Sequence, residues 1–140
     1  MEKLKLNHYA IWLAIVLQFV LGLLWYGPFF GEKWEHLVGL DLTSIEANQS
    51  GFSIWITNII SSISAMYLLA WLFVKIEIRT ALRGLFTSFL IAVTFIFLTS
   101  LTNNLFAHIP YGLAWITGGF SMVGFSIAGV IFGVWTKKVK

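Results

Sequence analysis

Four long apolar segments, separated by polar stretches, set the pattern of this chain. They cover residues 8–26, 52–74, 81–103 and 112–136, and none carries a charged residue well inside its apolar run. An α-helix rises about 1.5 Å per residue, so each segment is long enough to cross the ~30 Å hydrocarbon core of a bilayer. The shorter alternating segments of a spanning β-barrel are absent. The pattern therefore predicts an all-α integral membrane protein, in which residues 1–140 form one membrane domain with four transmembrane helices in a bundle.

Residues at the ends of these segments predict where the helices begin and end. Asn7 and Thr80 precede the first and third segments, and their side-chain oxygens can accept hydrogen bonds from the free amides of a first helical turn. Gly27 and Pro28 follow the first segment. Because proline cannot continue a helix, we expect the first helix to end there.

The longest polar stretch is an outer loop over residues 27–51. Its first part alternates the apolar Phe30, Trp34 and Leu37 with charged residues, which predicts a short interfacial helix on the outer membrane surface. Further along, Thr43 and Glu46 have the spacing of a capping box, in which a hydroxyl and a carboxylate satisfy each other's backbone amides. We therefore expect a second helix to begin at Thr43.

Composition agrees with this architecture. The chain is 59% hydrophobic and 11% charged, whereas an ordinary soluble domain has about a quarter of its residues charged. It has no cysteine, which excludes disulfides and thiolate metal sites. The formal charge is +3, but the basic residues flank the apolar segments, so we expect no nucleic-acid partner.

The positions of the basic residues predict the orientation. Four crossings place the N-terminus, the connection between the second and third segments, and the C-terminus on one side. Eight of the nine Lys and Arg residues lie there, and Lys33 lies on the other side. Because Lys and Arg concentrate on the cytoplasmic side, we expect a multi-pass protein of the cytoplasmic (inner) membrane with both termini in the cytoplasm. The eight residues are Lys3, Lys5, Lys75, Arg79, Arg83, Lys137, Lys138 and Lys140.

Small residues recur at helical spacing within the apolar segments. Ala14, Gln18 and Gly22 are four residues apart in the first segment, and Gly129 and Gly133 form a GxxxG pair in the fourth. Small residues let helix backbones approach closely, and an amide can form a hydrogen bond across the contact. We interpret these stripes as helix-packing faces.

The amide side chains allow another interpretation. Gln18, Asn58 and either Asn103 or Asn104 are uncharged polar residues within or at the end of spanning segments. Such residues usually serve helix packing when they are few. The alternative is that they converge on a small cavity and contact a ligand there.

Few residues of the chain could carry chemistry. Glu32 and His36 are four residues apart and share a face if that loop is helical, and His108 lies on the same side of the membrane. These three are the candidate metal ligands, because zinc accepts two histidines and a carboxylate. The chain lacks HExxH spacing, so we expect no metal and no cofactor. It also lacks GxSxG, a phosphate-binding loop and a catalytic triad pattern, so we expect no enzymatic activity and no catalytic residue.

The most distinctive sequence ends the first segment, where residues 22–34 read GLLWYGPFFGEKW. It resembles the Gly-x-x-Trp-Tyr-x-Pro pattern of the domain of unknown function 1761 family, a group of small bacterial membrane proteins. Looser similarity follows at residues 103–106 and within the fourth segment. Ala107, His108 and Ile109 stand where relatives often carry a charged pair. The resemblance implies a four-helix membrane fold in the bacterial envelope and no known activity.

The same motif suggests a site. Pro28 breaks the helix at the interface, and a turn at Gly31 would let Trp25, Tyr26 and Trp34 form an aromatic cluster. One interpretation is an interfacial anchor, since aromatic residues concentrate at membrane boundaries. The other is that this outer turn holds a lipid-like or apolar ligand.

These patterns predict a small, non-enzymatic membrane protein. We expect an accessory or self-associating subunit of the cell envelope, in contact with membrane lipids and with a second copy or another membrane protein through its small-residue faces. One alternative is a binder or carrier of a lipid-like molecule at the outer aromatic turn. The other is an oligomeric channel or transporter, although the spans contain no charged residue that would couple it to protons or ions.

Overall fold

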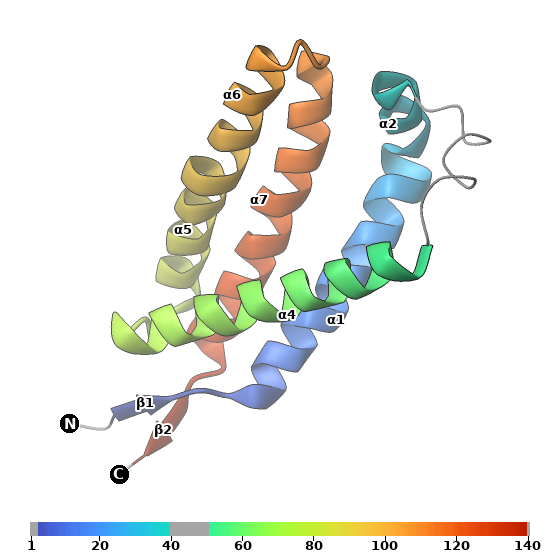
Figure 1. Ribbon diagram of the computed structural model, residues 1–140. Coiled ribbons are helices and arrows are strands. Elements are labelled where there is room, and N and C mark those ends of the chain that lie inside the picture. The colour runs from blue at the N-terminus through green and yellow to red at the C-terminus, as the bar shows by residue number, and fades with distance from the viewer. Residues whose placement is uncertain (1–2, 40–50, 140) are drawn as a thin grey trace.

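The computed structural model describes residues 3–39 and 51–139, and they are mostly helical (Figure 1). Four helical spans are long and apolar enough to cross a membrane, which makes this a multi-pass membrane protein by length and composition: His8–Phe29, Gly51–Lys75, Ala81–Phe106 and Tyr111–Val134. The prediction of four helices long and apolar enough to span a membrane is therefore confirmed. In chain order the elements are β1 (Lys3–Lys5), α1 (His8–Leu24), the π-helical η1 (Trp25–Phe29), α2 (Gly31–Val38), α4 (Gly51–Lys75), α5 (Ala81–Ile91), the π-helical η2 (Ala92–Phe97), α6 (Leu98–Phe106), α7 (Tyr111–Val134) and β2 (Lys137–Val139).

Helix α7 is the centre of the packing. It contacts α1, α4, α5, η2 and α6, and it carries more buried residues than any other described element. In Figure 1, α1, α7 and the α5–α6 span run in similar directions, whereas α4 crosses in front of α1 and α7 at a steep angle. Only the second half of α4 is packed, because residues 51–61 are all exposed. The helices therefore form a bundle that is open beside the first half of α4.

Glycines let α5 and α7 meet backbone to backbone. A methyl group on Gly84 would collide with the carbonyl oxygen of Gly129, and one on Gly133 would collide with that of Thr80. Ser88 is fully buried against Gly129. The GxxxG pair of α7 is therefore occupied by α5 of the same chain.

The predicted stripe on α1 faces α7 and α4. Ala14 is buried, Gln18 lies against Gly124, and the nearest atoms to Gly22 across the contact belong to Phe120. This face continues into the hydrophobic core at the end of the molecule that holds the termini. The core includes Ile11, Ala14, Ile15, Met66, Leu69, Phe73 and Phe132.

The break after α1 lies where Gly27 and Pro28 predicted it. Gly27 has non-helical angles (φ −104°, ψ −106°), and the Phe30 amide donates to the Trp25 carbonyl five residues back at 2.9 Å. Pro28 has no amide to donate, and this wider turn leads the chain into α2. A helix after the break is thus confirmed, and in Figure 1 it follows α1 in a similar direction. The expected helix start at Thr43 lies outside the described residues.

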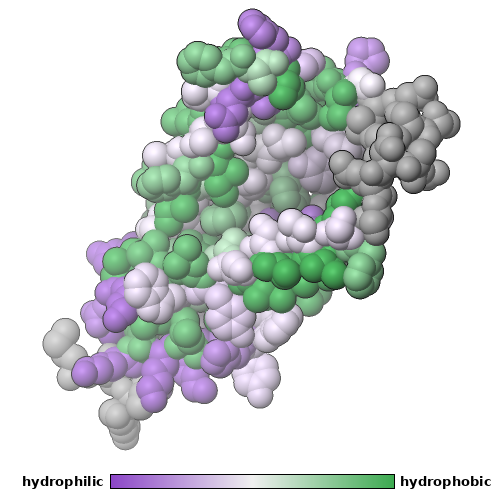
Figure 2. All heavy atoms as spheres, in the orientation of Figure 1, coloured by the Kyte–Doolittle hydropathy of each residue, from purple (hydrophilic) through white to green (hydrophobic). Residues whose placement is uncertain are grey.

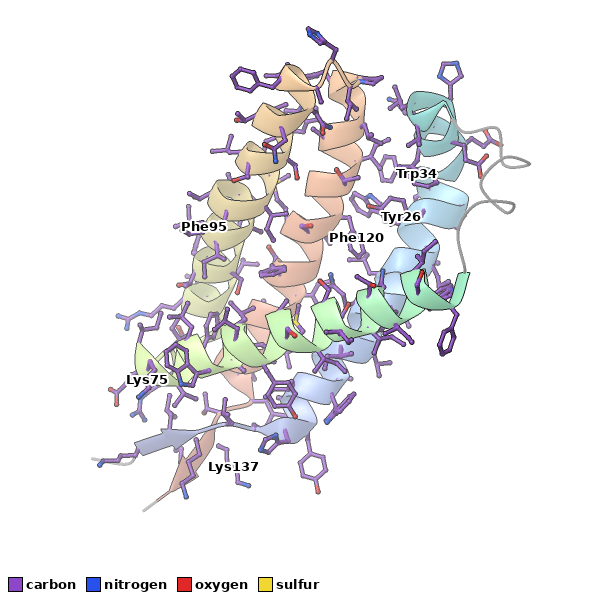
Figure 3. The ribbon with its side chains drawn as sticks, viewed as in Figure 1. Tyr26, Trp34, Lys75, Phe95, Phe120 and Lys137 are labelled. Carbon is purple, nitrogen blue, oxygen red and sulfur yellow. The ribbon has the colours of Figure 1, made fainter. Side chains whose placement is uncertain are left out.

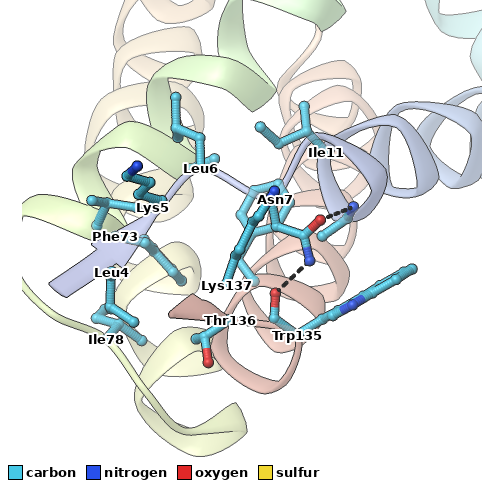
Figure 4. A pocket seen from close by; sticks show the side chains of 14 residues that line it. Leu4, Lys5, Leu6, Asn7, Ile11, Phe73, Ile78, Trp135, Thr136 and Lys137 are labelled. Carbon is cyan, nitrogen blue, oxygen red and sulfur yellow. Dashed lines mark hydrogen bonds between the residues drawn. The ribbon is translucent and has the colours of Figure 1, made fainter. Parts of the chain in front are cut away.

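The two ends of the chain form an antiparallel β-ribbon, which the sequence pattern did not predict. Lys3 lies opposite Val139, Leu4 opposite Lys138, and Lys5 opposite Lys137. Asn7 joins the ribbon to the helices, as Figure 4 shows. Its Oδ1 accepts a hydrogen bond from the Ala10 amide at 3.4 Å, which confirms the predicted helix cap, and its Nδ2 donates to the Trp135 carbonyl at 3.0 Å. Both termini therefore lie at one end of the molecule.

Replacing Asn7 with alanine is expected to lower the free energy of unfolding by about 1–2 kcal/mol, because both hydrogen bonds are lost. Asn7→Asp keeps the acceptor that caps α1 and removes the donor to the Trp135 carbonyl. Its free energy of unfolding should therefore fall by less than that of Asn7→Ala. Reversible unfolding in mixed micelles, followed by circular dichroism, measures both. Equal stability of Asn7→Ala and the unchanged protein would contradict this role.

Candidate functional site

A wide cleft opens between the second half of α1, the first half of α4 and the middle of α7. Its volume is about 1190 Å³, slightly above the ~300–1,000 Å³ of common small-molecule sites. In Figure 2 the surface is hollowed above α4, where pale residues of intermediate hydropathy lie next to hydrophobic ones. The steep crossing of α4 produces this space, because its first half diverges from α1 and α7.

One wall of the cleft is polar but uncharged. Along α4, Ser53, Thr57 and Ser61 recur every four residues and therefore share a helix face. Asn58 and Ser62 lie on the same face. Gln18 of α1 and Ser121 of α7 complete this wall, and among residues 3–39 and 51–139 no Asp, Glu, Lys, Arg or His lines the cleft.

The hydroxyl and amide groups of this wall differ in how they are satisfied. The Thr57 hydroxyl donates to the Ser53 carbonyl at 2.8 Å, and the Ser121 hydroxyl to the Thr117 carbonyl at 3.3 Å. In the described part of the chain, the side-chain amides of Gln18 and Asn58 have no such partner. A primary amide has two donors and an acceptor, and it is costly to leave unpaired inside a membrane. The hydroxyls of Ser61 and Ser62 likewise have no partner among the described residues, but each amide, with two donors and an acceptor, has the larger hydrogen-bonding capacity to spare.

The end of the cleft farthest from the chain termini is aromatic. The Tyr26 ring lies 5.5 Å from Phe120 and 5.6 Å from Trp34, the latter edge to face. Figure 3 shows Tyr26, Trp34 and Phe120 together between α2 and α7. Trp25 lies behind them, 4.7 Å from Phe30 and 6.4 Å from Phe120 between ring centroids.

Trp25 fixes this cluster to α7. Its indole Nε1 donates to the Ile116 carbonyl at 2.9 Å, and Gly119 leaves room for its ring, since a methyl there would lie 3.2 Å from Trp25 Cζ2. Gly31 lies under the Tyr26 carbonyl, where a methyl would be only 2.7 Å from the oxygen. Among the glycines of the motif, Gly31 is therefore required by close approach, whereas a methyl group on Gly22 or Gly27 would meet no close neighbour.

The residues predicted from sequence fall into three groups. Tyr26 and Asn58 line the cleft together with Gln18, whereas Trp25 and Trp34 support it through ring contacts. Pro28 is exposed in η1 and does not line it.

Asn103 and Asn104 do not reach the cleft. They lie near the end of α6, where their backbone carbonyls accept the amides of Ala107 and Ile109 at 2.9 Å each. Their place is the turn between α6 and α7. The structure therefore does not bring this pair together with Gln18 and Asn58.

The structure does not bring the candidate metal ligands together. Over residues 3–39 and 51–139, no three side chains of His, Asp or Glu form a group able to hold a metal ion, so Glu32, His36 and His108 are not such a set. His108 instead has a positive φ of 56° in the turn before α7. His8, the third histidine, lies 3.1 Å from the Tyr67 hydroxyl.

Sequence reasoning missed part of the polar wall and one aromatic ring. Ser53, Thr57 and Ser61 carried a detectable signal, because a repeat of hydroxyl residues every four positions marks one helix face. Phe120 carried none, since one Phe in an apolar helix does not reveal which neighbour it meets.

Comparison with known proteins gives a family and no activity. The family model described as Protein of unknown function (DUF1761) matches residues 9–133. No curated protein and no solved structure is a significant match. The matched range includes the aromatic turn and nearly all of the four spans, which confirms the resemblance seen in residues 22–34. The chain belongs to the DUF1761 family.

Proposed function

We propose that this protein binds a lipid-like amphiphile in the cleft between α1, α4 and α7. The observation that carries the proposal is the division of the cleft into an uncharged polar wall and an aromatic, apolar end. A molecule with hydrogen-bonding groups and an apolar body matches both surfaces. The cleft is also open, so an amphiphile could enter from the surrounding bilayer.

The side-chain amides of Gln18 and Asn58 can form hydrogen bonds with the polar group of the ligand. Gln18 lies near the middle of the first span, and Asn58 lies on the exposed half of α4. Inside a bilayer, an amide without a partner has no bulk water to bond with. A hydrogen bond from the ligand to either amide is therefore not offset by the loss of a bond to water. Because the described lining of the cleft is uncharged, a neutral polar group fits that lining better than an ionised one.

We propose a binding role rather than an enzymatic one. The cleft offers serine and threonine hydroxyls, but its described lining holds no histidine or carboxylate to activate them as nucleophiles. A pair of groups with acid and base roles is the minimum that hydrolysis of a lipid ester would need.

We also propose the inner membrane of a bacterium as its location, with both termini in the cytoplasm. The support is the concentration of basic residues at one end, seven of them in the described part of the chain, and the pairing of β1 with β2 at that same end. With this orientation α2 lies on the outer side, as the amphipathic pattern of residues 29–38 favours.

Filling the cleft should displace its ligand. Ser61→Trp adds a large side chain within the cleft, whereas Ser64→Trp makes the same change at an exposed position of α4 that does not line it. We expect native mass spectrometry from nanodiscs to show one retained small molecule on the unchanged protein and on Ser64→Trp, and at least a tenfold lower bound fraction on Ser61→Trp. Organic extraction then identifies the molecule. Absence of a defined bound mass on the unchanged protein would contradict the proposal.

Self-association is the second candidate, and the exposed first half of α4 favours it. Residues 51–61 expose both polar and apolar side chains, which a second copy could cover. The GxxxG face is already used by α5, so an accessory or self-associating subunit would have to use α4 instead. A channel also requires several copies, because the packed core around Ala14, Met66 and Leu69 closes the inner end of the molecule. Dimer or ring masses in the same spectra would support this second candidate.

A further inference from the structure

The β-ribbon formed by the two termini has two different faces. Side chains of a strand alternate, and Leu4 is buried with 8% of its surface exposed, so Lys3 and Lys5 project from the opposite face. Lys137 lies directly opposite Lys5 in the register and therefore projects from that same outer face. Three lysines, two from β1 and one from β2, thus share one side of a ribbon only three residues long.

This arrangement is unfavourable without an anion. Like charges directly opposite each other destabilise an antiparallel pair, and an isolated two-stranded ribbon is marginal in water. Among the described residues, Glu77 is the one carboxylate at this end, and it lies 3.6 Å from Arg79 rather than on the ribbon. Lys75 lies at the same end with its Nζ 5.7 Å from the Trp71 ring centre, and it adds to the positive field.

Exposed aromatic residues of the kind that mark the headgroup level of a membrane lie next to the ribbon. Trp135 ends α7 immediately before β2 and has 48% of its surface exposed, and Tyr9 in the first turn of α1 has 78% exposed. Exposed Trp and Tyr side chains concentrate at the level of the headgroups. Figure 3 shows Lys137 projecting at this end, beside the first turn of α1.

We propose that the outer face of the β1–β2 ribbon binds the phosphate of anionic phospholipid headgroups, and that this binding keeps the two termini paired. Lys3, Lys5 and Lys137 donate to phosphate oxygens, which relieves the repulsion between Lys5 and Lys137. The same phosphate chemistry could come from free phosphate, so the test separates the two sources. This site is independent of the cleft and of its ligand.

Hydrogen exchange of the ribbon amides tests the proposal. In nanodiscs that contain phosphatidylglycerol, the amides of residues 3–5 and 137–139 should exchange about fivefold or more slowly than in nanodiscs of phosphatidylcholine alone. High salt should remove most of the difference, since it screens exposed charges. The doubly substituted Lys5→Gln, Lys137→Gln chain should lose this dependence on lipid charge, whereas Lys33→Gln at the opposite end should retain it. Amides of α7 serve as an internal reference for the fold.

Two outcomes would overturn the proposal. One is equal exchange of the ribbon amides in both kinds of nanodisc, which would show that the ribbon forms without anions. The other is equal protection by millimolar inorganic phosphate in phosphatidylcholine nanodiscs, which would assign the site to a free anion instead of a lipid headgroup.

Discussion

Adding a single methyl group at Gly84 is expected to lower the free energy of unfolding by about 2–3 kcal/mol or more. Gly84→Ala places its Cβ against the backbone carbonyl of Gly129, with the carbonyl carbon at 2.8 Å. Backbone atoms cannot move away by changing a rotamer, so α5 and α7 must separate. Reversible unfolding in mixed micelles, followed by circular dichroism, measures the loss.

Gly22→Ala is the matched control, because it makes the same change in α1. The added methyl would lie 3.8 Å from the Phe120 ring, an ordinary contact. Since alanine favours a helix over glycine by roughly 0.5–1 kcal/mol, this variant should be as stable as the unchanged protein or slightly more stable. Equal losses in the two variants would contradict the close contact between α5 and α7.

The second large effect is expected at Trp25. Trp25→Ala removes the ring that contacts Phe30 and Phe120 and the indole donor to the Ile116 carbonyl, so we expect a loss of about 3–5 kcal/mol. Trp25→Phe keeps most of the ring contact and loses the hydrogen bond, which predicts a loss of roughly 0.5–1.5 kcal/mol. Comparing the two variants in the same unfolding measurement separates the contribution of the ring contacts from that of the hydrogen bond.

Trp12 provides the control for this prediction. It lies in the same span, His8–Phe29, and has 50% of its surface exposed. Trp12→Ala should therefore lower the free energy of unfolding much less than Trp25→Ala. If both substitutions lower the free energy of unfolding equally, Trp25 is an interfacial anchor rather than the residue that fixes the aromatic cluster to α7.

The spanning helices were predictable because their signal is local. A run of about twenty apolar residues is enough to identify a span, and Asn7 and Thr80 act on amides only three residues away. The break at Gly27 and Pro28 is equally local, since the missing amide of proline is a property of one residue. These features do not depend on which helices meet.

The partners of the helices were not predictable in the same way. Gly129 and Gly133 indicate a close helix contact, but small residues look alike whether the partner is in the same chain or in another. The structure assigns α5 as the partner, which removes this face from any surface for self-association. The β-ribbon was also not predictable, because a lysine-rich segment of three residues gives no strand signal. The two segments pair because α1 and α7 bring the ends of the chain together.

The cleft was predictable only in part. The aromatic cluster and the amides of Gln18 and Asn58 were visible as unusual residues in apolar runs. That they share one cavity depends on the steep crossing of α4, and this crossing follows from how Met66, Leu69 and Phe73 pack against α1 and α7. Hydropathy specifies that α4 is long and apolar, but not its angle to its neighbours.

Photo-crosslinking from inside the cleft tests most directly whether it holds an amphiphile. Trp55 lines the cleft and Trp71 is exposed elsewhere on the same helix, so benzoylphenylalanine at either position replaces one aromatic side chain with another. We expect the probe at Trp55 to give one predominant lipid-like adduct of defined mass, and the probe at Trp71 to give adducts in proportion to the bulk lipids. The same mixture of bulk lipids at both positions, or adducts at Trp55 to a second copy of this chain, would contradict a ligand-binding cleft.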